Sequence, residues 1–230
     1  DRAADLAFSE DGRFLVWQAL GTGLPLTPFY QVWRADLESG VVVLASVASN
    51  GSDEGNGTSK QAAISPDGRL VVFASVADNH VPGDANRASD VFLRDLETGR
   101  TLLVSRTPAG SPGDGWSLRP FFSRDGRSLF FLSHAATLAP GDHNQAVDLF
   151  KVSLLNVGAG PLLVLQRNLT TGQARLLWTA TPGKSYRVQF KDDLNEPDWQ
   201  SLAGSFTGDI PVDVGASVSA SRFFRLVELP

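Results

Sequence analysis

The chain has 230 residues, of which 42% are hydrophobic and 20% are charged, a balance typical of a globular protein rather than a disordered one. Its formal net charge of −5 and its lack of a lysine/arginine cluster argue against nucleic acid and anionic membranes as partners. No apolar run approaches the roughly 20 residues of a membrane-spanning helix. The chain has no cysteine, which excludes disulfides, thiol nucleophiles and cysteine-based zinc sites.

One pattern repeats through the first two thirds of the chain. The motif Ser-x-Asp-Gly-Arg occurs at residues 9–13, 65–69 and 123–127, and each copy leads into a run of apolar residues. An Asp-Gly pair between apolar runs predicts a tight β-hairpin, because glycine adopts the positive φ that the turn needs and aspartate bonds the turn backbone. The apolar runs are rich in Val, Leu and Phe and therefore predict strands that are buried on both faces.

A second motif follows the first in each copy of the repeat. Gln-Val-Trp-Arg-Ala-Asp at 31–36 aligns with Asp-Val-Phe-Leu-Arg-Asp at 90–95 and with Asp-Leu-Phe-Lys-Val-Ser at 148–153. The first two of these segments continue into Leu-Glu-Ser-Gly or Leu-Glu-Thr-Gly, which predicts another hairpin. Each unit thus contains about four strands, and repeated groups of four short strands are typical of β-propeller blades. The predicted blades cover approximately residues 1–57, 58–115 and 116–156.

The combined pattern has a family resemblance. Ser-x-Asp-Gly-Arg, an apolar strand, and then Pro-Gly-Asp-x-Asn-x-x-x-Asp-Val-Phe-x-x-Asp-Leu-x-Thr-Gly resembles the WD-like propeller repeats of the TolB type, over roughly residues 3–155. Such repeats are found in many secreted or periplasmic bacterial proteins, so the resemblance implies blades and a secreted, periplasmic or cell-surface location. It implies no particular activity, because propellers carry many unrelated functions.

The character of the chain changes after a Gly/Pro-rich linker at residues 156–161. The period is lost, and about six short strands with alternating apolar and polar residues predict a small antiparallel β-sandwich over residues 157–230. The string Trp-Thr-Ala-Thr-Pro-Gly-Lys-Ser-Tyr-Arg-Val-Gln-Phe and the later Arg-Phe-Phe-Arg-Leu resemble the fibronectin-type-III-like C-terminal modules of large bacterial surface proteins. We expect Trp178, Tyr186 and Trp199 to be packing residues, with a sugar-binding aromatic platform as the alternative.

The predicted fold class is therefore all-β, with three four-stranded blades of a partial or self-completing β-propeller and a small antiparallel β-sandwich. Propellers usually have four to eight blades, so three blades leave two open sheet faces. Three arrangements would cover them: further blades in a longer propeller, a homodimer that completes a six-bladed ring, or an open array whose one end the C-terminal domain covers. The absence of methionine favours the first, because it predicts that the chain is a processed or excised piece.

Two loops carry a candidate metal site. Both read Asp-x-Asn-x-x-x-Asp, and their oxygens fall at alternate positions, as in loops that bind calcium. The alternative is a turn in which the Asp and Asn side chains bond their own backbone and need no ion. The candidate ligands are Asp84, Asn86, the carbonyl of Ala88 and Asp90 in the first loop, and Asp142, Asn144, the carbonyl of Ala146 and Asp148 in the second.

No catalytic centre is predicted. The sequence has no Gly-x-Ser-x-Gly motif, and its three histidines lack the spacing of a zinc site. His80 and His143 lie in or beside polar loops, where we expect exposed side chains. The favoured function is thus a non-enzymatic binding or scaffold protein, whose propeller loops present a surface to a protein or carbohydrate partner. The alternative is the C-terminal accessory region of a larger hydrolase or lyase whose catalytic residues lie elsewhere. No cofactor other than calcium is expected.

Overall fold

The structure, a computed structural model, contains no helix in the part of the chain that it describes. That part comprises residues 6–21, 29–107, 109–138, 146–155, 163–167, 174–178, 183–192, 195, 197–202, 204–207, 212–215 and 223–229. The chain divides into two compact units, Asp1–Lys151 and Val152–Pro230, which are described separately. The predicted all-β class is confirmed, and none of the described residues forms a helix that could cross a membrane.

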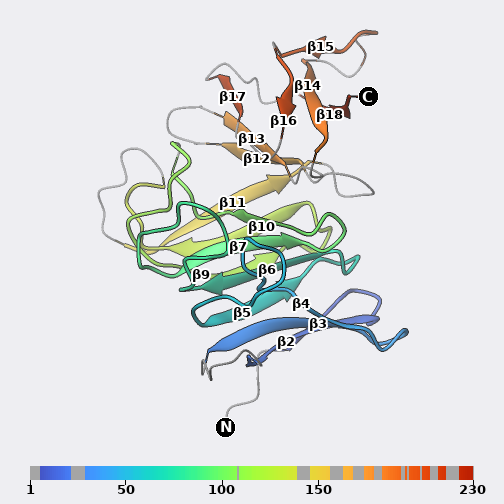
Figure 1. Cartoon of the computed structure of the whole chain (residues 1–230). Coiled ribbons are helices and arrows are strands. Elements are labelled where there is room, and N and C mark those ends of the chain that lie inside the picture. Colours follow the sequence, from blue (N-terminus) through green and yellow to red (C-terminus); the bar gives the residue numbers. More distant parts are fainter. Residues whose placement is uncertain are drawn as a thin grey trace. The chain divides into compact units, whose positions relative to one another are not determined.

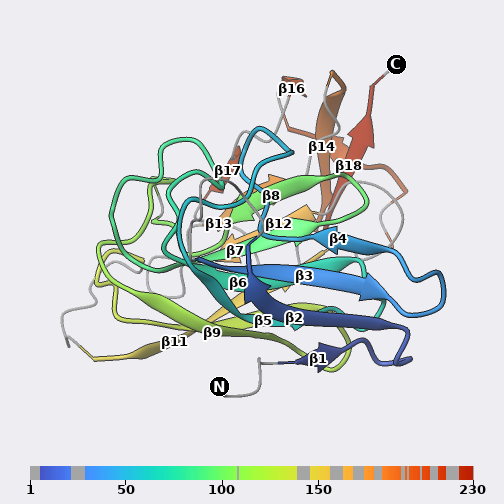
Figure 2. The same cartoon turned by 60° about the horizontal axis from the view of Figure 1, so that its bottom comes forward.

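Two four-stranded blades open the first unit. Blade 1 contains β1 (Ala7–Phe8), β2 (Phe14–Leu20), β3 (Tyr30–Asp36) and β4 (Val42–Leu44). Blade 2 contains β5 (Ser59–Ile64), β6 (Leu70–Ser75), β7 (Asp90–Asp95) and β8 (Arg100–Leu103). In both sheets the strands are antiparallel and follow one another in chain order, an order that Figure 2 shows for blade 1. This meander is the blade arrangement that the repeat predicts.

The third blade begins in the same way, with β9 (Ser117–Phe122), β10 (Ser128–Ser133) and β11 (Asp148–Leu154) as neighbours. In the second unit, the end of β11 pairs with β12 (Leu163–Arg167) through Ser153↔Leu165 and Leu154↔Val164. Residues 163–167, which the sequence analysis assigned to the C-terminal domain, thus pair with the end of β11 within the second unit. They also pair with β13 (Ala174–Trp178), so β12 lies between β11 and β13 in the sheet.

The second unit contains two antiparallel sheets around one core. One sheet has the order β17 (Val212–Gly215), β13, β12, while the other is formed by β14 (Ser185–Lys191), β15 (Gln200–Ser201), β16 (Phe206–Thr207) and β18 (Phe223–Glu228). The shared core consists of Leu163, Leu176, Trp178, Tyr186 and Val188, all fully buried. This is the predicted small sandwich, in which Trp178 and Tyr186 are core residues. The fibronectin-type-III resemblance stays a prediction.

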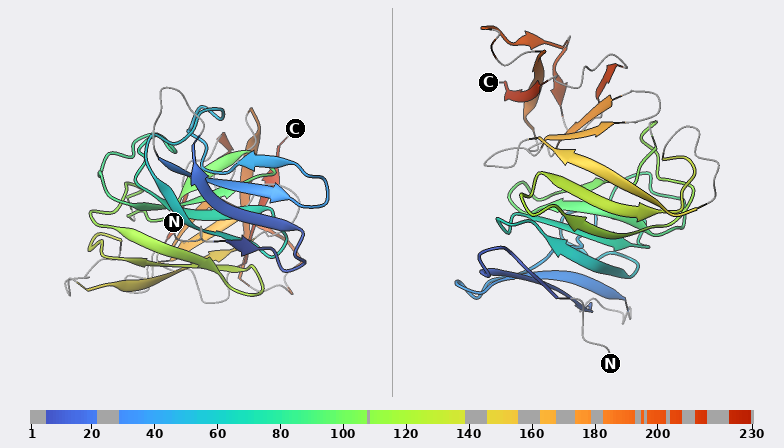
Figure 3. Two further views of the ribbon diagram at one scale, coloured as in Figure 1. Left: turned by 90° about the horizontal axis from the view of Figure 1, so that it is seen from below. Right: turned by 180° about the vertical axis from the view of Figure 1, so that it is seen from behind.

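The blades of the first unit lie on one another as layers (Figures 1 and 3). Blade 1 packs against blade 2 through the small residues Val16, Val32 and Ala45, and most of the residues that blade 2 contributes are larger. The residues of blade 2 in this layer are Ile64, Val71, Phe73, Phe92 and Leu103, four of which are larger than valine. Small residues on one sheet against large residues on the next let the two surfaces interdigitate, and this burial is the main source of stability for stacked sheets.

The first strands of blades 2 and 3 carry matching β-bulges. The register shifts within β5 between Lys60 and Ala63, and the pairing of β9 shifts in the same way around Arg119. Gln61 and Arg119 have φ values of 54° and 52°, a left-handed backbone that non-glycine residues seldom adopt. Gln61 Oε1 accepts the backbone N–H of Arg119 at 3.0 Å, so the side chain of one bulge satisfies the backbone of the next.

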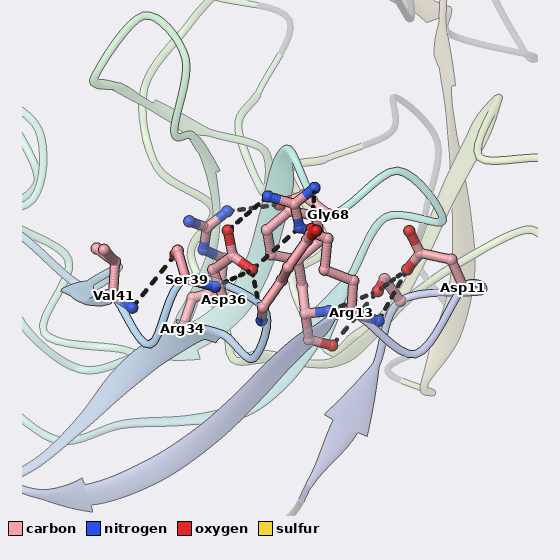
Figure 4. Close-up of polar contacts among 10 residues, drawn as sticks. Asp11, Arg13, Arg34, Asp36, Ser39, Val41 and Gly68 are labelled. Carbon is pink, nitrogen blue, oxygen red and sulfur yellow. Dashed lines mark hydrogen bonds and ion pairs between the residues drawn. The ribbon is translucent and has the colours of Figure 1, made fainter.

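The Ser-x-Asp-Gly-Arg motif builds an arginine clamp between two hairpins, shown for blade 1 in Figure 4. Arg13 donates from Nε and Nη2 to the two carboxylate oxygens of Asp36, at 3.0 and 2.7 Å. The guanidinium beside Asp36 holds the pKa of that carboxyl far below its usual range. Arg69 grips Asp95 in the same forked geometry, at 2.9 and 2.6 Å. The clamp thus ties the hairpin between the first two strands of a blade to the hairpin between the last two.

The clamp differs in strength from blade to blade. In blade 2 the side chains of Arg69 and Asp95 are 9% and 0% exposed, whereas Arg13 is 44% exposed in blade 1. In blade 3 the aligned residue is Ser153, whose hydroxyl carries no charge to hold Arg127. Arg69 therefore has a fully buried carboxylate partner, whereas Arg13 is itself exposed and binds a carboxylate that is nearly buried. The aligned position of blade 3 offers Arg127 no carboxylate, so the three arginines can be compared with one another.

Replacing Arg69 with lysine should destabilise the first unit by about 2 kcal/mol, because lysine keeps the charge but loses one of the two charged hydrogen bonds to a buried carboxylate. Arg13→Lys should cost less, since the side chain of Arg13 is 44% exposed to water, and Arg127→Lys should change nothing measurable. Urea unfolding of the three variants tests this order. Equal losses in all three would show that the clamp does not stabilise the blade.

Candidate functional site

The first unit has two different edges. The short hairpins of the Ser-x-Asp-Gly-Arg and Asp-Leu-Glu motifs all lie along the same edge of the blades. We call this edge the turn rim. Because the strands are antiparallel, the longer connections must lie at the opposite edge, which we call the loop rim (Figure 3). Its described residues are 21, 29, 45–58, 76–89, 104–107, 109–116, 134–138, 146 and 147. Long loops held by a rigid sheet are the usual place for binding residues.

Asp90, Asn86 and Ser105 form a buried staple at the loop rim. Asp90 is fully buried at the start of β7, where Oδ1 accepts the Ser105 hydroxyl at 2.6 Å and Oδ2 accepts the Asn86 amide at 2.7 Å. The same Asn86 nitrogen donates to the carbonyl of Gly113 at 2.8 Å. The loop between β6 and β7 is thereby joined to the connection that leads from blade 2 to blade 3.

Blade 1 makes the same connection with one residue. Gln31 aligns with Asp90 and is also fully buried. Its Oε1 accepts the Ser46 hydroxyl at 2.6 Å, and its Nε2 donates to the carbonyl of Gly55 at 2.8 Å. The glutamine side chain is longer than that of aspartate, so Gln31 alone makes the connection that in blade 2 needs both Asp90 and Asn86. The role common to the two blades is to hold the connection between blades, which explains why the repeat has a polar residue here.

The hydrogen bonds of Asn86 are those of a turn that needs no ion, which is the alternative to a calcium loop in the sequence analysis. Its Oδ1 accepts the backbone N–H of Ala88 at 3.0 Å, so the amide turns nitrogen rather than oxygen toward Asp90. Among the described residues, no three acidic or histidine side chains are grouped closely enough to hold a metal ion.

The second loop is described only in part: Ala146 and Asp148 are seen, whereas Asp142 and Asn144 lie outside the described residues. Calcium binding at either loop stays a prediction. In the first loop it requires Asn86 to leave Asp90, and calcium added to chelated protein should then raise the melting temperature.

Burial changes the protonation of both carboxylates in the first loop. It raises the pKa of Asp84 to about 6 and that of Asp90 to about 7, although the hydrogen bonds from Ser105 and Asn86 oppose the shift at Asp90. The folded state therefore binds these protons more tightly than the unfolded chain. The resulting contribution to stability is present in acid and is lost as the pH rises through about 6 to 7.

His80 lies inside the loop rim and not on it, so the expectation of an exposed side chain was wrong. It is 1% exposed and packs edge-on against Phe73 and Phe92. Its Nδ1 donates to the carbonyl of Val47 at 3.0 Å, which leaves Nε2, 3.1 Å from the Ser75 hydroxyl, as an acceptor. The ring is thus a neutral bridge between the loop after β6 and the connection between blades. Burial lowers the pKa of His80 to about 4.

The outer surface of the loop rim is polar, with one large aromatic side chain. Trp116 is 62% exposed immediately before β9. Exposed carboxylates surround the loops at Asp53, Asp78 and Asp114. All three accept a side-chain hydrogen bond. Asp53 accepts the Asn50 amide at 2.6 Å, Asp78 accepts the Asn56 amide at 2.6 Å, and Asp114 accepts the Thr137 hydroxyl at 2.9 Å.

Sequence reasoning singled out neither Gln31 nor Trp116. The repeat alignment contained the signal for both, because Gln31 stands in the column of Asp90 and Trp116 in the column of Thr58. A change of residue type in a repeated column marks the place where one blade differs from its neighbours. The alignment could not say that Gln31 is buried and Trp116 exposed, since that depends on how the connections fold over the blades.

No protein-family model matches the chain, and no curated protein matches it. Among solved structures, it is similar to the putative TolB from Agrobacterium tumefaciens (14% identity, TM-score 0.39), covering 100% of this chain and 60% of that one. It is also similar to the β-propeller domain of the Trilobed protease from Pyrococcus furiosus (11%, TM-score 0.37, covering 89% and 57%) and to the tricorn protease (12%, TM-score 0.41, covering 93% and 27%).

The chain therefore spans about 60% or less of the length of these three structures. The strands of blades 1 and 2 follow one another in chain order, as in a propeller blade. The blade assignment itself rests on that strand order and on the repeat. The propeller part of the predicted resemblance is thus confirmed by the fold of the chain.

Replacing His80 with leucine, the residue that blade 3 has in the aligned position (Leu138), should weaken the acid sensitivity of the first unit. His80 contributes stability that is complete above its unfolded pKa of 6.5 and is lost as the pH falls toward its folded pKa of about 4. At neutral pH the variant should lose about 2 kcal/mol, because Ser75 and the Val47 carbonyl lose their partner. Urea unfolding across this pH window tests both effects.

The opposite pH dependence of Asp84 and Asp90 is present in both proteins, so the difference between wild type and variant isolates His80. Identical slopes of stability against pH in the two proteins would contradict the buried, neutral bridge.

Proposed function

We propose that the first unit is a non-enzymatic binding module whose loop rim binds a basic segment of a protein partner. The observation that carries the proposal is the loop rim itself: its connections are long, yet side chains from the sheets hold them in place. Gln31, Asn86 and His80 each tie a connection between blades to a strand or to a neighbouring loop. A loop that is already ordered loses little conformational entropy on binding, so this organisation favours affinity.

The chemistry of the surface suggests the class of partner. The exposed carboxylates of Asp53, Asp78 and Asp114 attract lysine and arginine side chains, and Arg87 is an exposed cation among them. Trp116 offers a flat aromatic surface for an aliphatic stem or a guanidinium. Aromatic residues surrounded by polar groups are also the usual composition of a binding hot spot.

The buried polar groups of this region support a binding role over catalysis. Ser75 contacts His80, but its hydroxyl also accepts the backbone N–H of Ala77 at 3.0 Å, and both residues are about 1% exposed. A substrate could not reach such a pair without opening the interface between blades. A role as an accessory part of a larger hydrolase or lyase is the second reading from the sequence, and it uses the same surface. The secreted, periplasmic or cell-surface location is proposed on the sequence resemblance.

The proposal is tested by panning a random peptide display library against the whole chain. We expect enriched peptides rich in lysine and arginine, whose binding weakens with added salt because the attraction is electrostatic. Trp116→Ala should reduce their binding by about tenfold. Leu37→Ala is the matched control, because Leu37 is 52% exposed on the turn rim and should leave binding unchanged.

Peptides that are lost with Leu37→Ala but kept with Trp116→Ala would place the binding surface on the turn rim and contradict the proposal. A glycan array provides the second arm. Saturable binding of an uncharged glycan that depends on Trp116, without any enriched peptide, would overturn the choice of a protein partner in favour of a carbohydrate.

A further inference from the structure

Blade 1 has an apolar face that none of the other described strands of the first unit covers. Cross-strand pairs place Phe8 beside Leu15, Trp17 beside Trp33, and Trp33 beside Leu44 on one side of the sheet. Phe8 is 56% exposed, and the other four residues are partly buried. The face is opposite to the one that packs on blade 2 through Val16, Val32 and Ala45. Neighbouring apolar side chains that stay partly exposed on one face of a sheet are typical of an interaction surface.

Blade 2 shows what such a face binds. The repeat alignment matches the open residues of blade 1 with Ile64, Val71, Phe73, Phe92 and Leu103. In blade 2 these five residues are 0–7% exposed, because the small-residue face of blade 1 covers them. The chain therefore contains a working example of the contact that blade 1 lacks on its other side, and the natural occupant is the opposite face of a propeller blade.

The glycines of the repeated turn point the same way. A Cβ at Gly68 would overlap the ring of Phe14, and a Cβ at Gly126 would come within 3.0 Å of Pro66, because the preceding blade covers both turns. At Gly12, in the aligned turn of blade 1, the same Cβ would meet nothing within 4 Å. The turn of blade 1 thus has the same sequence motif as the two covered turns, but no preceding blade packs against it.

The complementary face is exposed at the other end of the unit. In blade 3 the residues aligned with Val32 and Arg34 are Leu149 and Lys151. Leu149 is 61% exposed, and Lys151 is exposed with its ammonium above the ring of Phe130. Phe121 pairs with Phe130 on the same face and is 47% exposed. One chain therefore presents both halves of a blade-to-blade contact.

We propose that two copies of this chain associate head to tail, with the open face of blade 1 in each copy covered by the outer face of blade 3 in the other. Because each copy has one of each face, a two-fold axis generates two identical contacts and closes a ring of six blades. Closure consumes both faces of both copies, so association stops at two. This surface is distinct from the loop rim, and the inference does not rest on the proposed function.

The internal contact also predicts a specific bond across the new one. Arg34 of blade 1 donates to the carbonyl of Gly68 in the turn of blade 2, at 3.3 Å (Figure 4). Lys151 aligns with Arg34, and Gly12 aligns with Gly68. In the dimer, Lys151 of one copy therefore donates to the Gly12 carbonyl of the other. The turn at Gly12 has space for this contact, because nothing lies within 4 Å of a Cβ built there.

Light scattering after size exclusion, at two concentrations, tests the proposal on the whole chain. We expect a particle of twice the 24.6 kDa chain mass at the higher concentration. Phe8→Glu on one face and Leu149→Glu on the other should each weaken association at least about tenfold, since each places a charge in a buried apolar contact. Val76→Glu is the control, because Val76 is 51% exposed outside both faces.

Mixing the two variants distinguishes this geometry from others. A mixed pair contains one contact with both changes and one contact with neither, so Phe8→Glu and Leu149→Glu should form a dimer together that neither forms alone. Several results would overturn the proposal: a monomer at the higher concentration, species larger than a dimer, or a dimer that survives Leu149→Glu. If Phe8→Glu fails to fold by circular dichroism, Val42→Glu, at a 52% exposed position of the same face, replaces it.

Discussion

The packing of one blade face on the next is the constraint on which this structure depends. In the contact between the first two blades, blade 1 contributes a small-residue face that includes Val16 and Val32, and blade 2 contributes a face that includes Phe73 and Phe92. A sheet with two apolar faces is stable only when both are covered, because the free energy comes from the area removed from water. Blade 2 meets this condition within the chain. Blade 1 meets it on one side, and we propose that a second copy covers its other side.

Polar contacts then hold the hairpins and the connections between blades in place. The arginine clamps act at the turn rim, where Arg69 holds two hairpins of one blade together through Asp95. Staples such as Gln31 and Asn86 act at the loop rim, where they hold the connections between blades. The result is a rigid frame that carries an exposed tryptophan and fixed carboxylates, and the proposed binding role rests on these features.

The sequence predicted those parts of the fold that local patterns determine. Asp-Gly turns and alternating apolar runs gave the hairpins, their order and the all-β class, since glycine and strand periodicity act within a few residues. The environment of His80 could not be predicted in this way, because the Val47 carbonyl that binds it comes from the preceding blade. The candidate metal loop was limited for a similar reason: Asp90 and Asn86 suggest ligands in sequence, but Ser105 and Gly113 from another segment take up their hydrogen bonds.

Hydrogen–deuterium exchange of the whole chain tests most directly whether face coverage controls stability. The account predicts that the amides of β6 and β7, whose blade is covered, exchange slowest at every protein concentration. Those of β2 and β3 should exchange faster in dilute solution, and their protection should increase with concentration as the open face is covered. If β2 and β3 were as protected as β6 and β7 in dilute monomer, coverage of the faces would not be the source of blade stability.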